Sequence, residues 1–381
     1  MRRAANAVAL LTALHVAAPG LPAQQPASQG NHSSKKKAFT ILGVLGGGLL
    51  GFLFAKGAKT DAGIFIGVGA VVGGTAGYFI GGQFDKVYEQ RFKGLPELNP
   101  PNISSDIDGD PGALAVVDSF VVVGSTTGVQ LFIDAHDFVP WTRRATGVKG
   151  IKVVTLSPHS DWLAVGSSAG LYLYPPRRGP GGLVRSGDVM AVTATSQRVY
   201  AAVDSRIEVV PVNADTVRQW PGVDLPSPAR DLALDTTRAL LWAVTDSALE
   251  AFNLSGDSLV RLGSTSVDAG ARRLAVDGIT VAVALGERGV RVFDGTDPSL
   301  PRQESVWSAG QFAYDVALDG KRMFIAEGPE GVYVAELGGP VPRTLGIARD
   351  LGFTSTLVTY KHYAYLIDRR TNSIRRFGTD F

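Results

Sequence analysis

The chain has 381 residues, which is enough for one large domain and a shorter segment. Its 37 Lys and Arg residues nearly balance its 35 Asp and Glu residues, and the net charge of +2 argues against a nucleic-acid-binding surface, which needs a concentrated basic excess. The absence of cysteine excludes disulfides, thiol catalysis, cysteine-ligated zinc and a lipidated cysteine anchor.

The N-terminal segment, residues 1–23, has the pattern of a secretory signal peptide. Met1-Arg-Arg is a short basic region, residues 4–18 form an apolar stretch, and Pro19 breaks that stretch before small residues. Ala18 and Ala23 both fit a cleavage site. The remainder of a twin-arginine pattern is missing, so the sequence favours the general export route. An uncleaved anchor helix is the alternative interpretation.

Two apolar segments follow a polar, low-complexity stretch at 24–37 that is predicted to be a flexible linker. The segments, 38–55 and 62–83, are uncharged, and each approaches the roughly 20 residues that cross a bilayer. Glycines recur in them at four-residue steps, a spacing that lines up along one side of a helix and lets two backbones pack closely. These glycines are Gly43, Gly47, Gly51, Gly69, Gly73, Gly77 and Gly81. The sequence therefore predicts a transmembrane hairpin over residues 38–83, through which homo-oligomers could also form.

This hairpin resembles the glycine-zipper two-helix membrane domain of the 17-kDa surface-antigen type, found in bacterial envelope proteins. The resemblance rests on residues 43–51 and 67–82. It implies that the protein is anchored in the lipid bilayer of the bacterial cell envelope. A glycine-rich phosphate-binding loop is the alternative, but such a loop needs Lys followed by Ser or Thr after its glycines, and Lys56 is followed by Gly57.

Residues 84–96 are predicted to form a juxtamembrane stalk, because the prolines from Pro96 onward prevent a helix from continuing. Two spans place both ends of the hairpin on one side of the membrane, so a cleaved signal peptide leaves the C-terminal domain extracytoplasmic. Basic residues at 35–37 and between 86 and 93 flank the hairpin on that side, against the tendency of positive charge to stay in the cytoplasm. The expected extracytoplasmic position of the C-terminal domain therefore rests on the signal peptide, and the flanking charges oppose it.

The rest of the chain carries a short apolar pattern seven times. The copies begin at Gly128, Gly170, Arg206, Ala248, Gly289, Gly331 and Ser373, so their spacing is nearly constant. A period near 40 with strand-like alternation is typical of β-propeller blades. Residues 97–381 are therefore predicted to form an all-β, seven-bladed β-propeller.

The sixth repeat illustrates the internal order of a blade. Strands are predicted at 315–319, 322–326 and 332–335, and a fourth, outer strand should follow. The last repeat ends after its third strand, so residues about 97–105 are predicted to supply its missing outer strand and to close the ring. Three tryptophans fall in the outer segments, where packing is their expected role: Trp141, Trp220 and Trp307.

Blades five and six resemble the LVIVD-repeat family of propeller-like bacterial proteins. The resemblance rests on residues 289–298, which end in an Asp-Pro turn, and on residues 314–326 and 331–335. The other blades keep the hydrophobic register and lack the Asp-Pro turn. The resemblance implies the fold and no catalytic residues, because that family has no shared catalytic motif. A propeller also hosts many unrelated activities.

Motifs for catalysis and metal binding are weak. Residues 106–110 alternate carboxylates as a calcium loop does, but Pro111 stands in place of its glycine and no Glu follows at the required distance, so an exposed turn is favoured. His136, His159 and His362 occupy three different repeat positions, and Gly-x-Ser-x-Gly is absent. No metal, cofactor or catalytic residue is predicted.

Charged residues occupy equivalent positions in three blades. Asp231, Arg273 and Asp315 each stand where the innermost strand of a blade begins. They are candidates to line one mouth of the central channel with alternating charge. Mutual ion pairing is the favoured interpretation of the set.

Together these patterns predict an exported, membrane-tethered propeller that acts as a non-enzymatic scaffold in the bacterial envelope, with recognition by loops on one face. The expected partners are the bilayer and a protein or small ligand, without nucleic acid. Two alternatives remain. One is a propeller hydrolase, either lactonase-like or sugar-acting, and the other is a membrane-perturbing oligomer built on the glycine helices.

Overall fold

The structure, a computed structural model, describes residues 95–98, 103–134, 138–144, 148, 150–156, 162–175, 181–212, 214, 219–255, 258–349 and 351–379. These residues belong to one compact unit, Gly94–Phe381. The predicted signal peptide, linker and glycine hairpin, residues 1–83, lie outside the described residues, as does the stalk up to residue 94.

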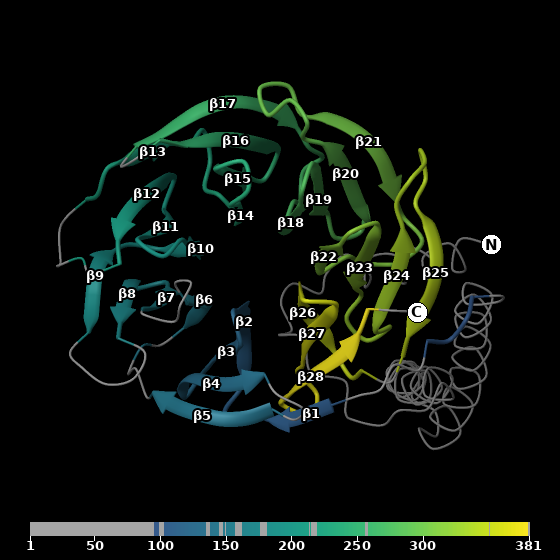
Figure 1. Cartoon of the computed structure of the whole chain (residues 1–381), viewed down its shortest axis with the longest axis horizontal. Coiled ribbons are helices and arrows are strands. Elements are labelled where there is room, and N and C mark those ends of the chain that lie inside the picture. Colours follow the sequence, from purple (N-terminus) through teal and green to yellow (C-terminus); the bar gives the residue numbers. More distant parts are fainter. Residues whose placement is uncertain are drawn as a thin grey trace, which may run out of the picture. The chain divides into compact units, whose positions relative to one another are not determined.

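The described strands form seven four-stranded antiparallel sheets arranged in a ring (Figure 1). Blade one consists of β2 (Pro111–Val117), β3 (Phe120–Ser125), β4 (Gly128–Asp134) and β5 (Phe138–Arg144). Blade two consists of β6 (Ile151–Leu156), β7 (Leu163–Ser167), β8 (Gly170–Tyr174) and β9 (Gly182–Ser186). Blade three consists of β10 (Val189–Ala194), β11 (Arg198–Val203), β12 (Arg206–Pro211) and β13 (Gly222–Asp224). Blade four consists of β14 (Asp231–Asp235), β15 (Leu240–Val244), β16 (Ala248–Ser255) and β17 (Ser258–Ser266). Blade five consists of β18 (Arg273–Asp277), β19 (Thr280–Ala284), β20 (Val290–Asp294) and β21 (Arg302–Trp307). Blade six consists of β22 (Asp315–Asp319), β23 (Arg322–Ala326), β24 (Val332–Glu336) and β25 (Arg343–Ala348). Blade seven combines β26 (Thr354–Tyr360), β27 (Tyr363–Asp368) and β28 (Ser373–Gly378) with β1 (Ile103–Asp106) from the start of the domain.

The period-two alternation of apolar residues explains this architecture, because it gives each sheet two apolar faces that pack against both neighbours. The core lies between blades. One cluster, for example, joins Tyr200 and Ile207 of blade three to Leu241 and Phe252 of blade four. The third strand of every blade begins within one residue of its predicted start, which confirms the predicted seven-bladed propeller.

The predicted ring closure is confirmed, with a correction to its extent. β1 pairs antiparallel with β28, from Ile103 opposite Arg376 to Asp106 opposite Ser373. The start of the predicted closing segment lies elsewhere, since Glu97 bridges in parallel to Ile347 in β25 of blade six. The amide of Leu98 donates to the carbonyl of Ile347 at 2.9 Å.

A glycine explains why this short segment can lie against β25. A Cβ atom at Gly346 would lie 2.6 Å from the carbonyl oxygen of Pro96 and 2.8 Å from the Leu98 side chain. Gly346 therefore leaves the space that residues 96–98 occupy on the outer edge of blade six. A segment this short that pairs once has no periodicity, so the sequence pattern did not predict this contact.

Antiparallel order also divides the connections between two faces of the ring. We call upper face the one that carries the loops entering each innermost strand and the turns between second and third strands. The lower face carries the turns between first and second strands and the loops between third and fourth strands. Asp231, Arg273 and Asp315 start innermost strands, so they belong to the upper face.

Candidate binding face

The innermost strands begin differently in two parts of the ring. In blades one, two, three and seven, the register shifts near the first residue of the innermost strand. In blades four, five and six, β14, β18 and β22 pair without a shift from their first residues, which are Asp231, Arg273 and Asp315. The three charged residues thus stand at equivalent places in three consecutive, regular inner strands.

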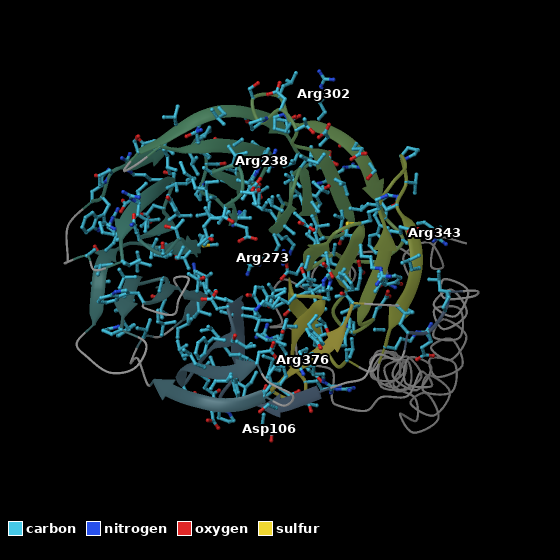
Figure 2. All side chains as sticks on the ribbon, viewed as in Figure 1. Asp106, Arg238, Arg273, Arg302, Arg343 and Arg376 are labelled. Atoms are coloured by element: carbon cyan, nitrogen blue, oxygen red, sulfur yellow. The ribbon has the colours of Figure 1, made fainter. Side chains whose placement is uncertain are left out.

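The structure brings these three side chains together at the upper mouth of the channel. Nη1 of Arg273 lies 4.0 Å from Oδ1 of Asp231, and the Arg273 side chain is 30% exposed. Figure 2 shows Arg273 toward the centre of the ring, whereas Arg302 lies at the periphery. Arg273 interacts electrostatically with both Asp231 and Asp315, although only the Asp231 pair is within ion-pair distance.

Burial shifts the pKa values of both aspartates upward. Desolvation raises the pKa of Asp315 to about 7, opposed by the positive charge of Arg273 and by the backbone N–H of Leu357. Desolvation also raises the pKa of Asp231 from its usual 3.8, again opposed by Arg273. Burial acts to lower the pKa of Arg273, but the two carboxylates hold that pKa above its ordinary value.

The carboxylates also connect neighbouring blades. Oδ2 of Asp231 accepts the amide of Leu274 in blade five at 2.9 Å, and Oδ2 of Asp315 accepts the amide of Leu357 in blade seven at 2.9 Å. A carboxylate that accepts amides of the next blade holds two sheets in register. The set therefore acts as a structural clamp around the channel mouth.

A cluster of aromatic rings lies on the same face, above blades five to seven. We call Phe312, Tyr314 and Phe353 the aromatic shelf. The ring centroids of Phe312 and Tyr314 are 4.5 Å apart, and those of Tyr314 and Phe353 are 5.4 Å apart in an edge-to-face arrangement. All three residues are half-buried, so each keeps part of its surface accessible to solvent.

Two glycines support the shelf from below. A Cβ at Gly286 would lie 3.1 Å from the ring of Phe312, and a Cβ at Gly328 would lie 2.8 Å from the ring of Tyr314. Both glycines have positive φ angles, 61° and 59°. Each also forms an antiparallel bridge to the start of the next blade, Gly286 with Ala313 just before β22 and Gly328 with Thr354 at the first residue of β26.

Two carboxylates hold the loops that carry the shelf. Oε2 of Glu327 accepts the amides of Gln311 and Phe312, both at 2.7 Å, and Oδ1 of Asp368 accepts the amide of Phe353 at 3.3 Å. Glu327 is 2% exposed and Asp368 is fully buried. Within the described parts of the chain, paired loops of this kind occur at the blade junctions five–six and six–seven. The shelf is thus a rigid surface feature.

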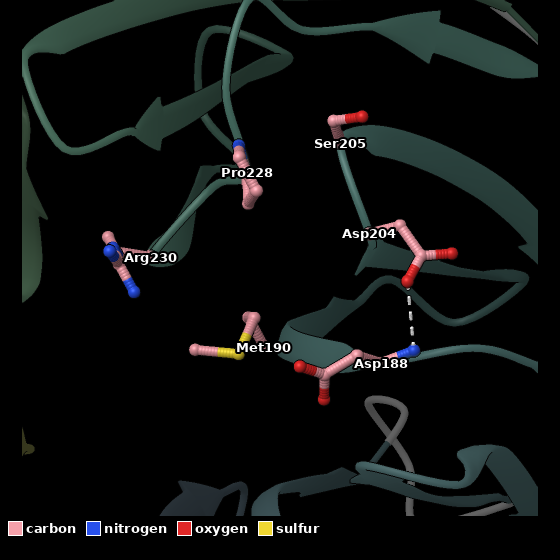
Figure 3. Close-up of a pocket in the computed structure, with 6 residues that line it drawn as sticks. All are labelled: Asp188, Met190, Asp204, Ser205, Pro228 and Arg230. Atoms are coloured by element: carbon pink, nitrogen blue, oxygen red, sulfur yellow. Dashed lines mark hydrogen bonds between the residues drawn. The ribbon is translucent and has the colours of Figure 1, made fainter.

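A shallow pocket lies on the upper face between blades three and four (Figure 3). It encloses about 320 Å³ and is lined by Asp188, Met190, Asp204, Ser205, Pro228 and Arg230. Its charges already have partners: Asp188 lies 2.5 Å from Nζ of Lys152, and Arg230 lies 3.6 Å from Asp246. The amide of Asp188 donates to Asp204 at 3.1 Å. The charged groups that line the pocket thus already interact with other groups of the protein, which leaves them less able to bind a ligand.

Other residues singled out in the sequence do not converge on this face. Trp307 is 1% exposed and donates its indole N–H to Thr344, so it packs as predicted, and Trp220 is partly buried in a core cluster. β5 contains Trp141, whose side chain lies outside the description. His362 is exposed on the lower face, 3.4 Å from Asp319. His136 and His159 fall in undescribed segments.

The acidic turn before the first blade is held by hydrogen bonds to protein groups. Asp108 accepts the side-chain amide of Gln130 at 3.1 Å, and Asp110 lies 3.4 Å from Arg369. Where the structure describes the chain, no group of three or more His, Asp or Glu side chains is placed to hold a metal ion. The described residues also include no helix long and apolar enough to cross a membrane.

The ring of seven four-stranded sheets defines the chain as a seven-bladed β-propeller. No protein-family model and no curated protein matches it. Solved structures do match. A chain in the crystal structure of the mitotic checkpoint complex is 11% identical, with a TM-score of 0.62, over 74% of this chain and 93% of that one. The β-propeller domain of Cps50 (Swd1) from Myceliophteria thermophila is 14% identical, with a TM-score of 0.57, over 72% and 99%. The Pan2 WD40 domain of Neurospora crassa is 12% identical, with a TM-score of 0.56, over 75% and 98%. At these identities the likeness establishes the fold.

Proposed function

We propose that this protein is a non-enzymatic scaffold that binds a protein partner through the upper face of its propeller. The observation that carries the proposal is the aromatic shelf. Partly exposed aromatic rings are enriched at protein interfaces, because they bury a large apolar area at a small cost in conformational entropy. Here Phe312, Tyr314 and Phe353 are held by backbone bridges and buried carboxylates, so a partner would meet a preformed surface.

The similar solved structures support this proposal at the level of the fold. One of the three is a chain within a named complex, the mitotic checkpoint complex. The sequence of this chain offers no catalytic motif that would favour the hydrolase alternative.

We further propose that residues 38–83 tether the propeller to the membrane of a bacterial envelope, with the domain outside the cytoplasm. Support comes from the two uncharged segments and the seven spaced glycines, which resemble a glycine zipper. Removal of residues 38–83 should then release the otherwise unchanged chain from the membrane fraction. Retention of that deletion variant in the membrane pellet would contradict the tether.

Site-specific photo-crosslinking tests which face binds. A photoreactive residue at Gln311, exposed beside the shelf, should form discrete protein adducts in cells that produce the full chain. The control is Ile279, which is 52% exposed on the lower face and should give no such adducts. Equal adduct patterns from both positions, or adducts from Ile279 alone, would overturn the proposal.

A further inference from the structure

The charge beside the aromatic shelf indicates the chemistry of the partner. Arg272 is exposed at the end of the loop that enters blade five. Its guanidinium carbon lies 5.0 Å from the ring centroid of Phe312 and 5.9 Å from that of Tyr314. Stacking on two rings fixes the position of this cation at the edge of the shelf.

Arg272 differs from the neighbouring arginines in its partners. Arg230, at the equivalent position of blade four, lies 3.6 Å from Asp246, and Arg291 forms an ion pair with Asp268. Among the described residues, no carboxylate lies within ion-pair distance of Arg272. Its donors are therefore available to an incoming acceptor, while its flat face is occupied by the rings.

Two carboxylates in the turn that adjoins the shelf already bind other groups of the protein. Glu327 and Glu330 in the adjoining turn are 2% and 5% exposed. Glu327 binds the amides beneath the shelf, and Glu330 accepts the hydroxyl of Tyr333. Glu287 and Arg288 on the preceding turn are both exposed and of opposite charge. The shelf thus combines apolar rings with an oriented cation that has no ion-pair partner among the described residues.

We propose that the aromatic shelf and Arg272 together bind a protein segment in which an Asp or Glu lies next to a large apolar or aromatic residue. The apolar side chain packs on the exposed parts of Phe312, Tyr314 and Phe353. The carboxylate accepts hydrogen bonds from the Arg272 guanidinium. Charge complementarity selects this partner over a basic segment, which Arg272 repels. This inference rests on the proposed function of the upper face and names the partner's chemistry.

The test is a selection of random dodecapeptides displayed on phage against the purified full chain. Recovered peptides should carry Asp or Glu within two positions of an aromatic or large aliphatic residue. In fluorescence polarisation, Arg272→Gln should weaken their binding about tenfold, and added salt should weaken binding to the wild type more than to this variant. Arg302→Gln changes an exposed arginine at the outer rim and should leave binding unchanged (Figure 2).

Several outcomes would overturn the inference. They are recovered peptides that are basic or uncharged, binding that Arg272→Gln does not change, and a selection that yields no peptide sensitive to Arg272. Because Arg272 is exposed, its replacement is expected to leave the thermal unfolding midpoint in place, and that midpoint is measured alongside. If Gln311 still forms crosslinks while the peptide test fails, the upper face remains the proposed interface and only the acidic chemistry of the partner is contradicted. If a photoreactive residue at Gln311 forms no crosslinks, the proposed function of the upper face is contradicted as well.

Discussion

Tyr365 in blade seven donates a 2.5 Å hydrogen bond to Asp134 in blade one, across 231 residues of sequence. The other carboxylate oxygen of Asp134 accepts the guanidinium of Arg376, which is 5% exposed and lies over the rings of Phe138 and Tyr363. Asp134 therefore joins two side chains of the last blade to the first. Together with the pairing of β1 and β28, it holds the seam where the two ends of the ring meet.

Loss of this seam contact should lower stability in two distinguishable steps. Tyr365→Phe removes one hydrogen bond and should lower the free energy of unfolding by about 1 kcal/mol. Asp134→Ala removes the acceptor of both bonds and takes the carboxylate from a buried guanidinium, which should cost about 3–5 kcal/mol. Urea unfolding of the full chain measures both. Tyr360→Phe, in the same blade, serves as the control and should change stability by less than about 0.5 kcal/mol. Equal effects of the two tyrosine variants would contradict the role of the Asp134 bond.

The buried Asp315 predicts how stability depends on pH. Its folded pKa is about 7, against 3.8 for an unperturbed Asp, so between these values the folded state holds a proton that the unfolded state has lost. Raising the pH from about 4 to about 7 should therefore lower the free energy of unfolding, by at most about 1.4 kcal/mol per pH unit for this group. The raised pKa of Asp231 acts in the same direction.

Asp315→Asn should flatten this slope, as measured by denaturant unfolding at a series of pH values. Asp297→Asn is the matched control. Hydrogen bonds from Ser299 lower the pKa of Asp297, so it titrates below the window and its replacement should leave the slope intact. An unchanged slope in Asp315→Asn would show that Asp315 does not titrate in this range.

Two glycines with nearly the same backbone conformation allow the effect of backbone strain to be distinguished from the effect of a side-chain clash. Gly328 has φ 59° and Gly320 has φ 58°, so alanine at either position should cost about 1–2 kcal/mol. A Cβ at Gly328 would also lie 2.8 Å from Tyr314, whereas at Gly320 it would meet nothing within 4 Å. Gly328→Ala should therefore displace the shelf and reduce Gln311 crosslinking, and Gly320→Ala should reduce stability alone. Similar crosslinking in the two variants would show that Gly328 does not position the shelf.

The buried carboxylate of Glu327 should fix the loop that carries Phe312. Glu327→Gln replaces charge-assisted hydrogen bonds with weaker ones, at an expected cost of about 1–3 kcal/mol. Amide hydrogen exchange of Gln311 and Phe312 should become faster in this variant. Glu330→Gln, later in the same turn, should leave both amides protected, because Glu330 bonds to Tyr333 instead. Faster exchange in both variants would indicate general loosening of the turn.

The parts of the fold that repeat were predictable, and the parts that do not repeat were largely missed. The third strands could be located because alternation with period two recurs once in every blade, and a last repeat without a fourth strand implied a partner such as β1. The clamp residues could be aligned with one another, but their distances depend on the twist of three separate sheets. Only the structure showed that Asp315 binds the amide of Leu357.

The aromatic shelf was missed because its rings lie in entering loops, outside the alternating strands. A signal was nevertheless present in the sequence. Turns with glycine at both ends recur at 286–289 and 328–331, and the separation of Phe312 from Phe353 is nearly one repeat. Matching turn glycines to the aromatic residues of the next entering loop would have suggested the pairing. The ion pair of Arg230 with Asp246, and the lack of an ion-pair partner for Arg272 among the described residues, depend on side-chain geometry, which no spacing encodes.

The pairing of residues 96–98 with β25 has a mechanical consequence. Tension applied from the N-terminal side of the domain reaches the hydrogen bonds between Pro96, Leu98 and Ile347 before it reaches β1. These two bonds and the packing of Leu98 would yield first, before load reaches the four residue pairs between β1 and β28. The contact between residues 96–98 and β25 thus protects the seam of the ring, which bears load only after that contact has broken.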